Sequence, residues 1–156
     1  MCFLWVLGAL AALLQTSDPA SEQRTFSAGM ERLEHRAPVT PRLLRILAAD
    51  PGVRAAANGG PVKAEWFLVS EVHILNDWDR YLVVTAAGPL VETDRTQFWV
   101  FRVGVDGFDT LLHTSGRTLT VLATRSNYYR DIEVSSAVAN QGSKVRYWFN
   151  GREYVR

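Results

Sequence analysis

Beyond residue 61 the chain alternates apolar and polar residues with a period of two, and turn signals interrupt the alternation at short intervals. This pattern is typical of antiparallel strands. The turn signals are pairs rich in Asn, Asp and Gly, such as Asp106-Gly107 and Asn150-Gly151. They separate eight predicted strands: 65–75, 81–87, 97–103, 108–114, 118–124, 131–137, 144–149 and 153–156.

The segment 41–60 follows a helical pattern instead. Thr40 is a suitable N-cap, a proline occupies the next position, and apolar residues cluster within 43–47. Asp50-Pro51 repeats the same start signal, so the pattern predicts a short helix, a break and a further turn that ends at the Asn-Gly-Gly of 58–60. The apolar face can pack on the protein's own sheet or bind a partner. The predicted fold class is mainly β (α+β), with a short N-terminal helical segment.

Two parts of the β region resemble each other. The stretch LVVTAA (82–87) matches IEVSSA (132–137), and FWVFR (98–102) matches RYWFN (146–150). The matched residues keep the same alternation, so equivalent side chains are expected on equivalent faces. The sequence therefore predicts two similar four-stranded, blade-like units, 65–114 and 117–156, each of the size of one propeller blade.

Three stretches carry a resemblance to a known group of proteins: LNDWDRYLVV (75–84), NYYRDIEV (127–134) and YWFNGREY (147–154). The chain resembles the propeller-like repeats of exported bacterial proteins, including the FG-GAP and VCBS types. The resemblance implies blade architecture more than ion binding, because the first loop lacks the glycine and one residue of the usual calcium-loop spacing and the second has Arg130 at an acidic position. Two blades cannot close a propeller. We therefore expect a small barrel or sandwich, a sheet face covered by the helical segment, or a ring completed by other copies.

The N-terminus contains an apolar run at 2–14 that is too short to cross a bilayer and has the length of a signal-peptide core. The expected organisation is a signal peptide (1–20), a linker (21–40), a helical segment (41–60) and a β-meander domain (61–156). The alternative is that the apolar run is retained as an anchor. Cys2 is the only cysteine, so the mature protein would have no disulfide or thiol chemistry. The predicted location is secreted or periplasmic, with no membrane span after signal removal.

Charge excludes one class of partner. The formal net charge of +1 argues against a nucleic-acid binder. The first unit has eight acidic and three basic residues (−5), and the second has three acidic and seven basic residues (+4). Opposite charges favour packing of the units on each other or head-to-tail self-association, and they can also be solvated on outer faces.

Catalytic and cofactor motifs are not evident. No Gly-x-Ser-x-Gly motif or glycine-rich phosphate loop occurs. His73 and His113 fall in the first and last strands of one unit, where they would not converge on a metal. The Asn- and Asp-containing loops have too few acidic oxygens for calcium, so turn formation is the favoured role. No cofactor or metal is predicted, and the protein is expected not to be an enzyme.

The candidate ligand-binding residues are aromatic side chains and neighbouring arginines. Phe98 and Trp148 point away from the main apolar rows of their strands, so they are either recognition residues or buried under the helix. A second group lies in equivalent loops at one end of the two units, where it would line a ligand rim. This group contains Trp78, Arg80, Tyr128, Tyr129 and Arg130.

The leading hypothesis is a noncatalytic secreted or periplasmic binding module that recognises an envelope protein or a glycan. The alternative is a small inhibitor or immunity protein directed against an exported enzyme. A hydrolase ranks third because no nucleophile or metal set is evident.

Overall fold

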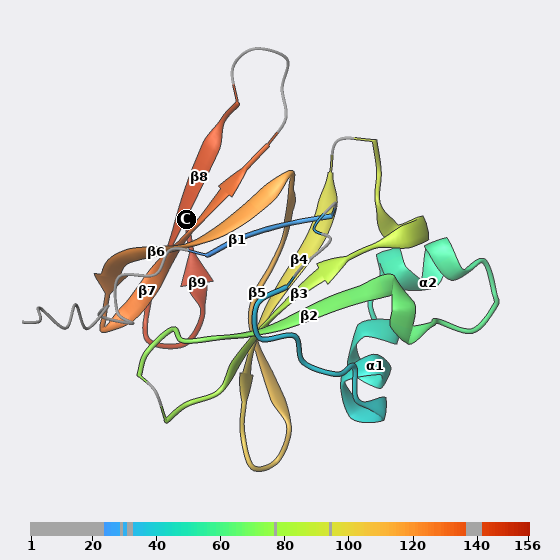
Figure 1. Ribbon diagram of the computed structural model, residues 1–156, viewed down its shortest axis with the longest axis horizontal. Coiled ribbons are helices and arrows are strands. Elements are labelled where there is room, and N and C mark those ends of the chain that lie inside the picture. Colours follow the sequence, from blue (N-terminus) through green and yellow to red (C-terminus); the bar gives the residue numbers. More distant parts are fainter. Residues whose placement is uncertain (1–23, 29, 31–32, 77, 94, 137–141) are drawn as a thin grey trace, which may run out of the picture.

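The predicted strands assemble into two antiparallel sheets (Figure 1). The structure is a computed structural model that describes residues 24–28, 30, 33–76, 78–93, 95–136 and 142–156. The predicted signal peptide lies outside the described residues. The mainly β fold class with a short helical segment is confirmed.

The four-stranded sheet has the order β2-β3-β4-β5 and contains β2 (Phe67–Val72), β3 (Tyr81–Ala86), β4 (Thr96–Val103) and β5 (Phe108–Gly116). The five-stranded sheet has the order β1-β6-β7-β8-β9 and contains β1 (Arg24–Ser27), β6 (Thr118–Ser126), β7 (Tyr129–Ser135), β8 (Lys144–Phe149) and β9 (Tyr154–Val155). The helices are α1 (Pro41–Ala48) and α2 (Pro51–Ala57), and short 3₁₀ turns occupy Ala64–Trp66 and Gly88–Leu90.

Both helices start where the sequence predicts. The Thr40 hydroxyl accepts a hydrogen bond from the Leu43 amide at 3.2 Å, and Asp50 Oδ1 accepts from the amides of Gly52 and Val53 at 2.8 and 3.2 Å. These caps satisfy amides that have no partner within the helix. Helix α2 ends at Asn58, whose left-handed backbone (φ 47°) stops further helical hydrogen bonding.

Buried apolar residues form two clusters, one on each side of the four-stranded sheet. The first lies between the two sheets and includes Val83 and Phe98 from one sheet and Ile132 and Val134 from the other. The second lies between the four-stranded sheet and the helices. Figure 1 shows the resulting order of layers: helices, four-stranded sheet, five-stranded sheet. The apolar face of the helices therefore packs on the protein's own sheet.

Strand β3 is buried at all six positions because both of its faces are covered. The same cover corrects the prediction for Phe98. Its side chain does point away from Trp99 and Phe101, but it is fully buried between the sheets rather than exposed or placed under the helix. Trp99 and Phe101 are the residues that face the helices.

The rows of apolar side chains that match between the two predicted units both point toward the helix side of the molecule. Leu82 and Val84 of β3 face the helices, and Ile132 and Val134 of β7 face the four-stranded sheet. The opposite row of the first unit is covered by the second unit, whereas no described residue packs a further layer on the opposite row of β8. Trp148 lies in that row and is 44% exposed. The relation of the units by duplication stays a prediction.

The predicted linker contains structure that the sequence pattern did not reveal. Strand β1 pairs with β6, with Phe26 opposite Leu119. Residues 35–37 run along the free edge of β2, where the Glu71 amide donates to His35 O and the Ala37 amide donates to Val69 O, both at 2.9 Å. No helix among the described residues is both long enough and apolar enough to span a membrane.

Candidate binding surface

Three connections meet at one end of the two sheets, and Figure 1 shows them together at the lower left. We call this region the loop end and define it as residues 74–76, 78–80, 125–130 and 149–154. The Arg130 amide donates to Ile74 O at 3.0 Å, which ties the start of β7 to the start of the first connection. Asn127 Nδ2 donates to Phe149 O at 2.6 Å and ties in the third. The loop end is therefore one connected surface built from both sheets.

Trp78 is the most exposed ring at the loop end. Asn76 Oδ1 accepts hydrogen bonds from the amides of Trp78 and Asp79 at 3.0 and 2.9 Å. This local turn is a standard role of asparagine and holds the backbone under the ring. The Trp78 side chain is 90% exposed.

Tyr128 is the second exposed ring, at 83% exposure. It belongs to the two-residue turn between β6 and β7, in which Ser126 pairs with Tyr129. Both central residues have positive φ, 50° at Asn127 and 70° at Tyr128. This geometry matches the twist of the hairpin, but it normally selects Asn-Gly, and a bulky residue there is strained. The fold thus keeps a large exposed ring at a position where glycine would be easier to place.

One arginine holds the two ring-bearing loops together. Arg125 Nη1 donates to Leu75 O and to Tyr128 O, both at 2.8 Å. A guanidinium that bridges two backbone carbonyls limits the relative movement of the loops that carry them. Sequence reasoning missed Arg125, because nothing in its local pattern separates it from a solvated arginine.

The strain at Tyr128 gives a stability prediction. Tyr128→Gly is expected to raise the free energy of unfolding by about 0.5–1 kcal/mol, because glycine adopts positive φ without a Cβ clash and part of this gain is lost to its greater unfolded-state entropy. Tyr128→Ala removes the same ring but keeps a Cβ, so it should bring no gain. Urea unfolding of the three proteins measures the difference. Equal stability of the Gly and Ala variants would contradict strain as the cause.

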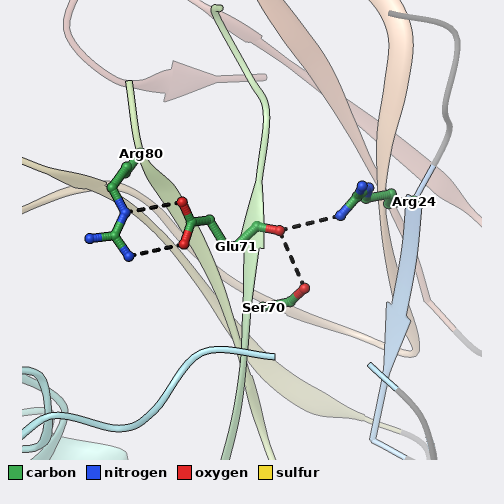
Figure 2. Close-up of polar contacts among 4 residues, drawn as sticks. All are labelled: Arg24, Ser70, Glu71 and Arg80. Carbon is green, nitrogen blue, oxygen red and sulfur yellow. Dashed lines mark hydrogen bonds and ion pairs between the residues drawn. The ribbon is translucent and has the colours of Figure 1, made fainter. Parts of the chain in front are cut away.

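Arg80 is at the edge of the loop end and is already paired. Its Nε and Nη2 donate to the two carboxylate oxygens of Glu71 at 3.0 and 2.9 Å (Figure 2). The hydrogen bonds from Arg80 lower the pKa of Glu71, so the pair stays ionised at neutral pH. An exposed pair contributes little stability. Its main effect here is to compensate the charge of Arg80.

Tyr129 and Arg130 are too buried to line the predicted ligand rim. The Tyr129 ring stacks on Phe149 with centroids 3.7 Å apart and meets Tyr81 edge-on at 6.0 Å. Arg130 is 3% exposed, and its carbonyl accepts a 2.6 Å hydrogen bond from Tyr154 Oη. Tyr129 and Arg130 therefore pack beneath the turn that carries Tyr128. Of the predicted loop residues, only Trp78, Arg80 and Tyr128 are on the accessible surface of the loop end.

The other predicted ligand residues are not part of the loop end. Phe98 is in the core between the sheets. Trp148 lies on the outer face of β8, in the same row as Arg146. The structure therefore does not bring the two predicted strand aromatics together on one surface.

Among the described residues, no group of three or more His, Cys, Asp or Glu side chains is placed to hold a metal ion. His113 instead stacks on Trp99 with centroids 4.9 Å apart, and its Nδ1 is 3.5 Å from Asp50 Oδ2. Its other nitrogen is 2.8 Å from Gln97 Oε1. These contacts give His113 a structural role between β5 and the start of α2.

Comparisons with protein-family models, with curated proteins and with solved structures found no match for this chain. The function that can be proposed therefore rests on the contacts and exposure of the loop-end residues.

Proposed function

We propose that the protein is a noncatalytic, secreted or periplasmic binding module that recognises a protein of the cell envelope through the loop end. The observation that carries the proposal is the exposure of Trp78 and Tyr128, 90% and 83%, on two loops that Arg125 bridges. Exposed apolar rings cost solubility, and tryptophan and tyrosine are enriched among the residues that dominate protein interfaces.

Three features support recognition of a protein in preference to another ligand. Both rings stand out from turns, so they can enter pockets on a partner surface. Their loops are fixed by the hydrogen bonds of Asn76 and Arg125, which lowers the entropy cost of binding. The nearby Arg80 is paired with Glu71, so the charge of this arginine is compensated beside the rings.

Capture from envelope extract with matched variants tests the proposal. The purified chain is immobilised beside Trp78→Ala, Tyr128→Ala and Val105→Ala, and the affinity of any captured protein is then measured. Val105 is a fully exposed apolar residue in the β4–β5 turn and serves as the control. Each loop-end variant is expected to weaken binding about tenfold or more, and Val105→Ala is expected to bind like the wild type.

The outcomes separate the hypotheses. Equal binding by all four proteins would overturn the proposed surface. Binding to a glycan array that depends on the same rings would move the assignment from protein to glycan. Capture of one exported hydrolase, with loss of its activity, would identify an inhibitor. Turnover of a hydrolase substrate that is abolished by one carboxylate or histidine change would show that the protein is an enzyme.

A further inference from the structure

The four sheet edges of the described structure are not protected equally. The edge strands β1 and β9 have four and two residues, and short edges offer little template for pairing. The edge of β2 is covered by residues 35–37, and Figure 2 shows Arg24 of β1 also reaching Glu71 O on this strand, at 3.3 Å. Strand β5 is the exception. It has nine residues, and no described backbone segment pairs with its outer side.

The hydrogen-bond alternation shows which backbone groups of β5 face outward. Gly104 and Gly107 exchange N–H···O bonds at the β4–β5 turn. Hydrogen-bonded and non-bonded pairs alternate along an antiparallel ladder. If this alternation is followed from the Gly104–Gly107 pair along the β4–β5 register and across the bulge between Val100 and Phe101, the β5 residues that bond to β4 are Asp109, Leu112, Thr114 and Gly116. The backbone groups of His113 and Ser115 therefore point away from β4. The same count makes Val69 and Glu71 point outward on β2, where residues 35–37 do bond to them.

The outward side of β5 forms one wall of a groove with a volume of about 860 Å³. Residues 110–115 line this wall and residues 153–156 line the opposite one, and the Tyr147 side chain connects the two through its hydroxyl, which is 3.0 Å from Thr114 Oγ1. The open stretch of six β5 residues is about 20 Å long at the usual rise of a strand. Leu111 and Leu112 lie at the mouth of the inter-sheet core, with exposures of 3% and 6%. The Asn150 amide donates a hydrogen bond to Glu153 O, so the next pair of the β8–β9 ladder, Phe149 with Tyr154, is a non-bonded pair. The backbone groups of Tyr154 therefore point away from β8, toward the groove.

We propose that this groove binds one extended segment, about six residues long, of a partner polypeptide, which adds to the free edge of β5 as a further strand. Backbone hydrogen bonds to His113 and Ser115 supply the pairing, as in other cases of strand addition. Alternate side chains of the segment face the mouth formed by Leu111 and Leu112, so apolar residues are expected at every second position. Glu153 and Arg156 lie at opposite ends of the β9 wall. The best segment therefore has a basic residue near one end and an acidic residue near the other.

A single segment fits the groove better than the β5 edge of a second copy. In a second copy, β5 is itself flanked by its own wall of residues 153–156. Pairing of two β5 edges would require both walls to occupy the space beside the shared strands. A lone extended segment brings no such wall.

A proline at an outward backbone position is the sharpest test. Ser115→Pro removes an amide that the β4–β5 ladder does not use, and edge strands tolerate proline at such a position. Ser115→Ala is the matched control, because both variants lose the 3.0 Å hydrogen bond from Arg95 Nη2 to the Ser115 hydroxyl. The probe is a phage library of random linear dodecapeptides panned on the wild-type chain. The most enriched peptide is then synthesised, and its affinity for each protein is measured.

The expected result is an alternating peptide that binds the Ala variant like the wild type and the Pro variant about tenfold more weakly or worse. Hydrogen exchange of the wild-type chain is a second readout that needs no variant: the amides of His113 and Ser115 should become protected when the peptide binds. Failure to enrich any peptide, equal binding to the Pro variant, or protection elsewhere would overturn the proposal. A wild-type dimer in light scattering that Ser115→Pro dissociates would also overturn it, because the edge would then pair with a second copy.

Discussion

Gly116→Ala is expected to lower the free energy of unfolding by about 2–3 kcal/mol. Gly116 ends β5, and only Arg117 separates it from β6, so the chain passes from one sheet to the other at this corner. A Cβ at Gly116 would lie 2.5 Å from Val134 Cγ1 and 2.7 Å from Ser135 O. The second contact is with backbone, which also accepts a 2.7 Å hydrogen bond from the Arg117 amide. Since that strand cannot move without breaking its own ladder, the corner must open.

Gly104→Ala is the matched control for this prediction. An added Cβ there has only Gly107 O within 4 Å, at 3.7 Å, and the φ of Gly104 is not positive. Its stability should change by less than about 0.5 kcal/mol. Urea unfolding followed by far-ultraviolet circular dichroism measures both variants. A loss at Gly116 no larger than at Gly104 would contradict the close approach of the two sheets at this corner.

The strands and helices were predictable because their signals are local. Alternation and Asn, Asp and Gly turns placed all eight strands of the β region, and the caps Thr40 and Asp50 placed both helices. Strand β1 was missed because its four residues form a strand only through pairing with β6, which is about 95 residues away. Local pattern carries no information about such a partner.

The face assignments were harder to predict than the strands. The alternation of apolar and polar residues assigns the side chains of a strand to its two faces, but it does not say whether one face or both faces are buried. Phe98 is buried because the four-stranded sheet is covered on both sides, and that depends on the second sheet lying where it does. Trp148 has the same type of position on β8, where the outer face is not covered by described residues, and it stays partly exposed.

Trp78 and Tyr128 lie on loops that Arg125 bridges, but the predicted turn between β6 and β7 was wrong in its extent. The alternation of the sequence predicts that β7 starts at residue 131, whereas the strand starts at Tyr129. A turn with both central residues at positive φ is normally signalled by Asn-Gly, and here Tyr128 takes the glycine position. Tyr129 and Arg130 therefore belong to the strand and face inward or are buried. The departure from normal turn chemistry is itself what marks Tyr128 as unusual.

Asp131 is the most consequential buried charge of the described chain. It lies opposite a bulge in β6. Val121 pairs with Ile132 and Arg125 pairs with Arg130, so the three residues 122–124 of β6 lie opposite the single residue Asp131 of β7. Its side chain has no exposure, Oδ2 accepts a hydrogen bond from Arg146 Nη2, and Oδ1 has no hydrogen-bond partner. Burial would raise the pKa of Asp131, but the hydrogen bonds, chiefly from Arg146, outweigh it and hold the pKa below the ordinary value of 3.8.

Arg146→Ala is expected to destabilise the protein by about 2–3 kcal/mol at pH 7, because it leaves a buried carboxylate without its cation. In the wild type the lowered pKa means that the unfolded chain binds the proton first, so the pair's stabilisation is complete above ~pH 5 and is lost as the pH falls through the folded-state pKa. In the variant, burial still raises the pKa of Asp131, and only Ser126 and Thr124 remain to lower it. We therefore expect the folded state of the variant to bind the proton more readily than the folded wild type and to lose less stability as the pH falls. The difference between the two proteins should therefore shrink to less than about 1 kcal/mol at ~pH 3.

Lys144→Ala separates this effect from the loss of any surface cation on β8. Lys144 pairs with Glu133 at 2.8 Å, but its side chain is 66% exposed. Such a pair contributes at most about 0.5 kcal/mol, so this variant should follow the wild type at every pH. Urea unfolding at pH 7, 5 and 3 gives the three curves. An Arg146→Ala deficit that stays constant from pH 7 to pH 3 would mean that Arg146 stabilises the sheet by packing rather than by holding the Asp131 charge.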